Sequence, residues 1–119
     1  MEKLTKQEEL AMQAIWKVGM GIVKDFLEVH LAPQPPYTTL ASTIKNLEKK
    51  GYVKGEKLGN TYQYRPMVEE EFYKQQFMSG FVKDYFENSY KQLVTFFAEH
   101  REISPDDLKE ILELIEQKK

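Results

Sequence analysis

The sequence contains no cysteine, so the protein can form neither a disulfide nor a thiolate metal site, and it has no thiol nucleophile. No apolar run approaches the roughly 20 residues of a transmembrane helix. The opening residues, MEKLTKQEEL, also lack the apolar core of a signal peptide. We therefore expect a cytoplasmic protein, and its 119 residues fall within the usual size of one domain.

Histidine is also scarce. His30 and His100 are far apart and have no metal-ligand spacing, and the sequence has neither a glycine-rich phosphate loop nor a nucleophile motif. The three consecutive glutamates at residues 69–71 are typical of the first turn of a helix, where negative charge meets the positive end of the dipole. We predict that the protein is not an enzyme and uses no metal or cofactor.

Charge is divided unevenly along the chain. Residues 1–66 carry ten Lys/Arg against seven Asp/Glu, or +3, and residues 67–119 carry seven against twelve, or −5, which gives the total of −2. Phosphate contacts are local, so a basic part of an acidic protein can approach a polyanion while the acidic part faces away. This division indicates that the two parts of the chain have different roles.

Three short helices are predicted before residue 52. A capping-box pattern, Thr5 with Glu8 three residues later, begins a first helix that should run to about Val18. A second short amphipathic helix should follow and end at a proline-rich stretch. The third should begin near residue 38 or 39 and end at Gly51, because glycine suits the left-handed conformation just past a helix.

The third predicted helix has an apolar and a polar side. Leu40, Ile44 and Leu47 form one stripe, so the opposite side presents hydrogen-bonding groups and cations, which suit base edges and phosphates. Residues 52–57 and 61–65 follow as the two strands of a hairpin. The candidates for base contacts are Thr39, Ser42, Thr43 and Asn46. The candidates for phosphate contacts are Lys45, Lys49, Lys50, Lys54, Lys57, Tyr62 and Arg65.

Beyond residue 67 the chain becomes rich in aromatic side chains. Residues 69–100 carry enough of them to form a broad apolar face, and a final helix beginning with Ser104 as its cap adds an apolar stripe. Such surface must be covered, since each buried ring contributes on the order of 1.5–3 kcal/mol. We predict that a second copy covers it, through Phe72, Phe77, Phe81, Phe86, Leu93, Phe97, Leu108, Ile111, Leu112 and Ile115.

Together these elements predict a mainly α fold with a small β-hairpin wing. A winged helix-turn-helix at residues 1–67, which binds DNA with its third helix, would precede a helical dimerisation region at residues 68–119. In this interpretation Trp16 and Phe26 belong to the core. Two alternatives remain open: a regulator that holds a small molecule between its aromatic C-terminal helices, and a winged-helix module that binds protein instead of DNA.

Four segments, LTKQEELAMQAIW, YTTLASTIKNLEKKGYV, GNTYQYRPMVEEEFY and QLVTFFAEHREISPDDLKEIL, resemble the penicillinase-repressor family of bacterial regulators. The resemblance covers nearly the whole chain. It implies a homodimeric transcriptional repressor that binds a dyad operator in double-stranded DNA and controls genes of the antibiotic-resistance type.

Two features differ from the family pattern. Copper-sensing members carry a cysteine-rich C-terminal motif, which a chain without cysteine cannot have. In the resistance repressors, induction through a membrane antirepressor metallopeptidase involves cleavage at an Asn-Phe bond in the dimerisation helix. The matching position here is Phe96-Phe97, so the resemblance implies this bond as a regulatory cleavage site without the usual asparagine.

Overall fold

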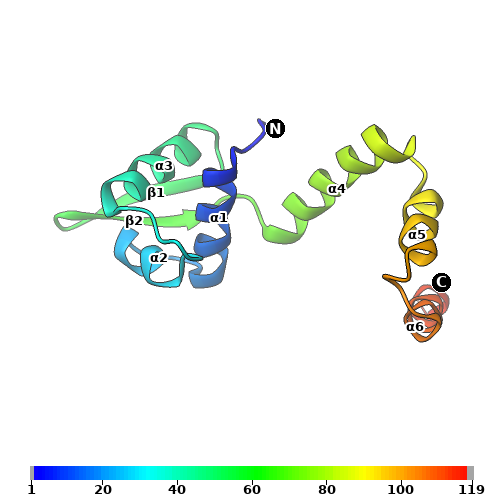
Figure 1. Ribbon diagram of the computed structural model, residues 1–119. Helices are drawn as coiled ribbons and strands as arrows, with labels where there is room; N and C mark the ends of the chain where they lie inside the picture. Colours follow the sequence, from blue (N-terminus) through cyan, green and yellow to red (C-terminus); the bar gives the residue numbers. More distant parts are fainter. Residues whose placement is uncertain (1, 118–119) are drawn as a thin grey trace. The chain divides into compact units, whose positions relative to one another are not determined.

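The structure is a computed structural model that describes residues 2–117. It divides into two compact units, Met1–Tyr73 and Lys74–Lys119. The elements, in chain order, are α1 (Lys6–Val18), α2 (Val23–Val29), α3 (Tyr37–Lys49), β1 (Val53–Leu58), β2 (Thr61–Pro66), α4 (Glu70–Phe86), α5 (Tyr90–Glu99) and α6 (Pro105–Gln117). The first unit contains the three short helices and the hairpin, as Figure 1 shows.

The predicted start of α1 is confirmed in detail. The Thr5 hydroxyl accepts a hydrogen bond from the Glu8 N–H at 3.2 Å, and the Glu8 carboxylate accepts one from the Thr5 N–H at 2.8 Å. This reciprocal pair satisfies two of the donors that a helix N-terminus leaves without intrahelical partners. The helix ends at Val18, as predicted, and Gly19 caps it with a φ of 89°.

Helix α3 starts earlier than residue 38 or 39. Pro36 is its N-cap and Tyr37 its first residue, so the helix gains an exposed aromatic side chain at its N-terminus. At the other end, Gly51 has a φ of 84°, the left-handed conformation that the sequence predicts. Leu40, Ile44 and Leu47 are all buried, which confirms the apolar stripe.

The hairpin pairs β1 with β2 in antiparallel register, with Val53 opposite Pro66 and Leu58 opposite Thr61. Tyr64 of β2 is also bridged to Gly21, in the loop between α1 and α2: the Tyr64 N–H donates to the Gly21 carbonyl at 2.7 Å, and the Gly21 N–H donates back at 3.0 Å. The base of the hairpin is therefore joined to the helices, while its tip extends beyond them.

One hydrophobic core holds the first unit together. Helices α1, α2 and α3 contact one another around it, and the base of the hairpin closes it. Phe26 is fully buried, as predicted. Trp16 packs at the edge of the core and its Nε1–H donates to the Val68 carbonyl at 2.8 Å. The core thereby reaches past the hairpin into the segment that leads to α4.

The first unit ends after Tyr73, not after residue 67. Val68 is buried in its core, and the Tyr73 ring lies 5.5 Å from the Trp16 ring. The Tyr73 hydroxyl donates to the Glu9 carboxylate at 2.9 Å. The boundary differs because these contacts attach the first turn of α4 to α1, which the change in composition at residue 68 does not reveal.

The aromatic segment 69–100 is interrupted. Helix α4 ends where Glu87 and Asn88 adopt positive φ angles of 52° and 64°, and the Asn88 N–H donates to the Val82 carbonyl at 3.1 Å. The expectation of one broad apolar face is wrong for α4: Phe72 and Phe77 are five residues apart, which turns their side chains about 140° from each other on a helix. Helix α6 begins as predicted, since Ser104 caps it and Pro105 is its first residue.

Candidate nucleic-acid interface

Helix α3 presents one continuous exposed face. Five residues of this face recur at intervals of four, three, one and three positions, starting from Thr38. This spacing keeps them on one side of the helix for three turns. All five are exposed: Thr38, Ser42, Lys45, Asn46 and Lys49. Within the described residues, neither lysine on this face forms an ion pair with a carboxylate. The face combines two unneutralised cations with three short hydrogen-bonding side chains.

Thr43 does not belong to this face. The residue is 8% exposed, and its hydroxyl donates to the Thr39 carbonyl one turn back, at 2.9 Å. The prediction that Thr43 contacts a base edge is therefore wrong for the structure described. The helical spacing turns Thr43 toward the core, and a threonine there satisfies its hydroxyl within the helix. Thr39 is half-buried at the edge of the face.

Lys50 also lies away from the exposed face. Its ammonium group donates to the Glu8 carboxylate at 2.7 Å and to the Lys3 carbonyl at 3.0 Å. It is the C-cap of α3, which β1 follows after two residues. We correct its assignment as a phosphate contact, because its charge is already paired with the carboxylate of Glu8, whose side chain is 6% exposed.

Burial and pairing act in opposite directions on Glu8. Burial alone would raise the pKa of its carboxyl group. The hydrogen bonds from Lys50 and from the Thr5 backbone, together with the Lys50 charge, outweigh burial and hold the pKa below its ordinary value. Glu8 therefore stays ionised and keeps Lys50 at the junction of α1 and α3.

The hairpin presents its predicted contacts on two faces. Lys54 and Arg65 are opposite each other in the register, and Lys57 is opposite Tyr62. Since side chains alternate between the two faces of a strand, the first pair and the second pair point to opposite sides. Glu56 shares the face of Lys54 and Arg65 and lies 4.0 Å from each of their charged groups. The wing candidates therefore form two separate surfaces.

Two exposed residues near the N-terminus of α3 were not among the predicted contacts. Thr38 precedes Ser42 by one turn on the exposed face, and Tyr37 is 52% exposed. The sequence carried a signal for both, because Pro36 suits the N-terminal boundary of a helix. A helix that starts at residue 37 contains both Tyr37 and Thr38.

The second unit exposes many apolar side chains. Helices α5 and α6 have no buried residue in the single chain. Of the side chains predicted to form a dimer, three are half-buried: Phe81, Phe86 and Leu93. The others are exposed by at least 37%: Phe72, which belongs to the first unit, and Phe77, Phe97, Leu108, Ile111, Leu112 and Ile115 of the second unit.

The Phe96-Phe97 bond lies inside α5, in regular helix. The Phe96 ring contacts Phe86 of α4 edge to face at 5.7 Å and the His100 ring at 4.4 Å. His100 is the C-cap of α5, and its Nδ1 lies 2.7 Å from the Phe96 carbonyl. Phe96 therefore helps to hold α5 against the end of α4.

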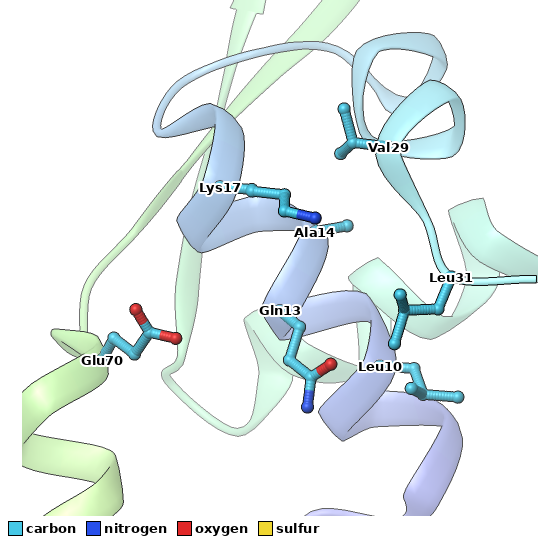
Figure 2. Close-up of a pocket in the computed structure, with 7 residues that line it drawn as sticks. All are labelled: Leu10, Gln13, Ala14, Lys17, Val29, Leu31 and Glu70. Carbon is cyan, nitrogen blue, oxygen red and sulfur yellow. The ribbon is translucent and has the colours of Figure 1, made fainter.

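A hollow of about 310 Å³ in the first unit is lined by residues of α1, of the end of α2 and of the start of α4 (Figure 2). Its residues are Leu10, Gln13, Ala14, Lys17, Val29, Leu31 and Glu70. The volume is at the lower end of the range for small-molecule sites. None of these residues is aromatic, so the hollow is not the site between aromatic helices that a ligand-responsive regulator was expected to have.

Residues 2–117 contain neither a candidate metal cluster nor a helix that could span a membrane. No group of three or more His, Cys, Asp or Glu side chains there is arranged to hold a metal ion. None of the helices in that range combines the length and the apolar character that a membrane span requires.

Three helices followed by a hairpin, with the exposed polar face on the third helix, define a winged helix-turn-helix protein that carries additional C-terminal helices. Sequence comparison agrees with this class. The chain matches the penicillinase repressor family over residues 4–117 and belongs to that family. It is therefore a member of a family of transcriptional repressors and not of an enzyme family.

Several curated relatives are regulators of methicillin resistance. The methicillin resistance regulatory protein MecI of Staphylococcus aureus (strain N315) is 23% identical over 117 residues, which cover 98% of this chain and 95% of that protein. MecI of Mammaliicoccus sciuri has the same identity and coverage. MecI of Staphylococcus aureus (strain Mu50 / ATCC 700699) is 24% identical over 108 residues, or 90% of this chain and 88% of that protein.

Proposed function

We propose that this protein is a homodimeric repressor that binds a dyad operator and blocks transcription. The observation that carries the proposal is the exposed face of α3, where Lys45 and Lys49 lie beside Ser42 and Asn46 and, among the residues that the structure describes, form no ion pair with a carboxylate. Side chains of this kind contact phosphates and base edges in the major groove, which is wide enough to admit a helix. Membership in a family of repressors supports the same function.

The surface of the second unit supports the proposed dimer. Leu108, Ile111, Leu112 and Ile115 form one stripe along α6, and each is between 37% and 56% exposed in the single chain. A stripe of this kind is stabilised when a matching surface covers it, by about 25 cal/mol for each Å² of apolar area. A second copy provides that surface and also supplies the second reading helix that a dyad operator needs.

The relatives named as regulators of methicillin resistance suggest which genes are controlled. We infer that the operator lies beside a gene of the antibiotic-resistance type. Release from DNA would then follow cleavage in α5 at Phe96-Phe97, which would separate the winged-helix unit from α6 and its apolar stripe. A membrane antirepressor metallopeptidase would start that pathway.

Selection of the full-length protein against random DNA duplexes tests the proposal directly. We expect the selected sequences to contain two inverted half-sites, and we expect the logarithm of the affinity to fall linearly with the logarithm of the salt concentration. Sedimentation should show a dimer at micromolar concentration, and Leu112→Asp should shift it to monomer. Selection that enriches no sequence, with binding independent of salt, would favour a winged-helix module that binds protein.

A further inference from the structure

Glu48 of α3 forms a direct polar link to the wing. Its Oε2 atom accepts a hydrogen bond from the Gly55 N–H of β1 at 2.9 Å. Gly55 is opposite Tyr64, whose own N–H and carbonyl bond to Gly21 on the far side of β2. In an antiparallel pair this pattern means that Gly55 and Tyr64 do not bond to each other, so the Gly55 N–H points outward from the edge of β1. Glu48 occupies that outward position.

The hairpin is thus held at both of its edges at the position of the Gly55–Tyr64 pair. Gly21 holds the β2 edge through two backbone hydrogen bonds, and Glu48 holds the β1 edge through its side chain. Other interactions within the hairpin include its strand pairing, a contact between the Tyr62 and Tyr64 rings at 6.3 Å, and ion pairs of Glu56 with Lys54 and Arg65 at 4.0 Å. The direction of the wing is therefore set near its base.

The contact between Glu48 and Gly55 is closely fitted. A Cβ atom at Gly55 would lie 2.6 Å from Cε1 of Tyr64 and 3.2 Å from Oε2 of Glu48. Tyr64 is 4% exposed and belongs to the core, so its ring has little freedom to move aside. The absence of a side chain at residue 55 lets the carboxylate and the ring approach the strand from two sides.

Glu48 places a negative charge beside the two lysines of the exposed face. It is adjacent in sequence to Lys49 and one turn after Lys45, the two cations of the exposed face. A carboxylate there opposes the approach of phosphate groups, so it weakens binding to DNA of any sequence. Since Glu48 does not attract DNA, its role at this interface is explained by the hydrogen bond that it accepts from the wing.

We propose that Glu48 is a positioning residue that determines specificity, because it fixes the angle between the reading helix and the wing. This inference rests on the proposed DNA-binding function. With that angle fixed, the base contacts of α3 and the phosphate contacts of the wing form together only on a correctly placed site. When Glu48 no longer holds Gly55, the β1 edge of the wing loses this contact while Gly21 still holds the β2 edge. The wing then tolerates more placements on DNA, and the preference for the operator falls.

Two substitutions at residue 48 separate the hydrogen bond from the charge. Glu48→Gln keeps an oxygen acceptor and removes the charge, whereas Glu48→Ala removes both. Alanine is a better helix former than glutamate at an exposed helix position, so α3 should still fold. Glu56→Ala is the matched control, because it removes a carboxylate from the wing whose described contacts are ion pairs at 4.0 Å and not a backbone hydrogen bond.

The first measurement uses the full-length protein without DNA. Hydrogen exchange of the Gly55 amide, followed by NMR, should accelerate by about three- to tenfold in Glu48→Ala, the range that one net hydrogen bond spans. It should stay within about twofold of the original protein in Glu48→Gln and Glu56→Ala. Unchanged exchange in Glu48→Ala would show that the carboxylate does not hold the wing and would overturn the inference.

The second measurement compares affinity for the selected operator with affinity for a scrambled duplex of the same composition. The ratio of the two affinities should fall by about three- to tenfold in Glu48→Ala. It should be kept in Glu48→Gln and Glu56→Ala, which should bind both duplexes more tightly. An equal fall in Glu48→Gln and Glu48→Ala, or no fall in either, would overturn the inference. If the original protein itself has no preference for any duplex, the proposed function is what fails.

Discussion

The Nζ atom of Lys50 lies 2.7 Å from Oε1 of Glu8, and this ion pair joins the C-terminal end of α3 to the first turn of α1. The Glu8 side chain is 6% exposed, and its carboxylate also accepts the Thr5 N–H that begins α1. A lysine that follows directly after the exposed lysine of the reading face thus has a different role. It contributes to the packing of the helix that carries that face.

This ion pair predicts an acid-dependent loss of stability. The pKa of Glu8 is lower in the folded protein than its ordinary value of 4.5. The ionised carboxylate therefore adds to the free energy of unfolding above pH 4.5, and this stabilisation is lost as the pH falls through the folded pKa. In Lys50→Met the loss of stability at acid pH that comes from Glu8 should be smaller. Without the lysine, burial of Glu8 is no longer offset, so the pKa of Glu8 is no longer held as low. Urea unfolding at a series of pH values from neutral to acid measures both curves. Parallel curves would contradict the assignment.

Lys49 and Lys50 should respond in opposite ways to substitution. Lys49→Ala should weaken binding to all DNA and reduce the salt slope by about one unit, with little change in stability. Lys50→Ala should cost about 1–3 kcal/mol in the free energy of unfolding, because it leaves a buried carboxylate without its partner, and it should leave the salt slope unchanged. Binding titrations at several salt concentrations and urea unfolding separate the two. The division of roles is rejected if the two variants behave alike.

Asn46 and Thr43 provide a second matched pair. Asn46→Ala should cost about 1–3 kcal/mol of binding free energy on the selected operator and relax discrimination at one base pair in each half-site. Thr43→Val keeps the shape of a buried side chain and removes a hydroxyl that bonds only within the helix, so discrimination should not change. Competition with single-base variants of the operator measures the difference. A loss of discrimination in Thr43→Val would return that residue to the reading face.

The start of α4 should be attached to the winged-helix unit through Tyr73. Tyr73→Phe removes the hydrogen bond to Glu9 and should cost about 0.5–1.5 kcal/mol in the free energy of unfolding. Tyr73→Ala also removes the ring beside Trp16 and should cost about 2–4 kcal/mol. Since Trp16 is the single tryptophan, its emission should shift to the red in the alanine variant only. Equal emission in both variants would show that the ring does not shield the indole.

Regulated release from DNA gives the last prediction. A protease needs extended backbone, and Phe96-Phe97 lies in a helix whose Phe96 ring packs on Phe86, so cleavage there requires local unfolding. Phe86→Ala should therefore speed cleavage at this bond by chymotrypsin, measured by mass spectrometry of timed digests. In the native host, fragments ending at Phe96 after exposure to a β-lactam would support regulated cleavage. Release of repression with an intact chain would contradict it.

Local sequence patterns predicted much of the fold. The capping box of Thr5 and Glu8, the positive φ of Gly51 and the cap at Ser104 depend on a few adjacent residues, and all three are present. The inward stripe of α3 followed from helical periodicity alone. These features could be predicted because both the cause and the effect lie within a few residues of each other.

Features that depend on distant residues could be settled only by the tertiary structure. The polar character of α3 indicated a reading face, but its limits were set by packing: Thr43 turns toward the core, and Lys50 bonds to Glu8, which is 42 residues earlier in the sequence. The same holds for the boundary after Tyr73, which depends on contacts with Glu9 and Trp16. A pattern within one helix cannot specify which charge on another helix a lysine will meet, because that depends on how the two helices pack.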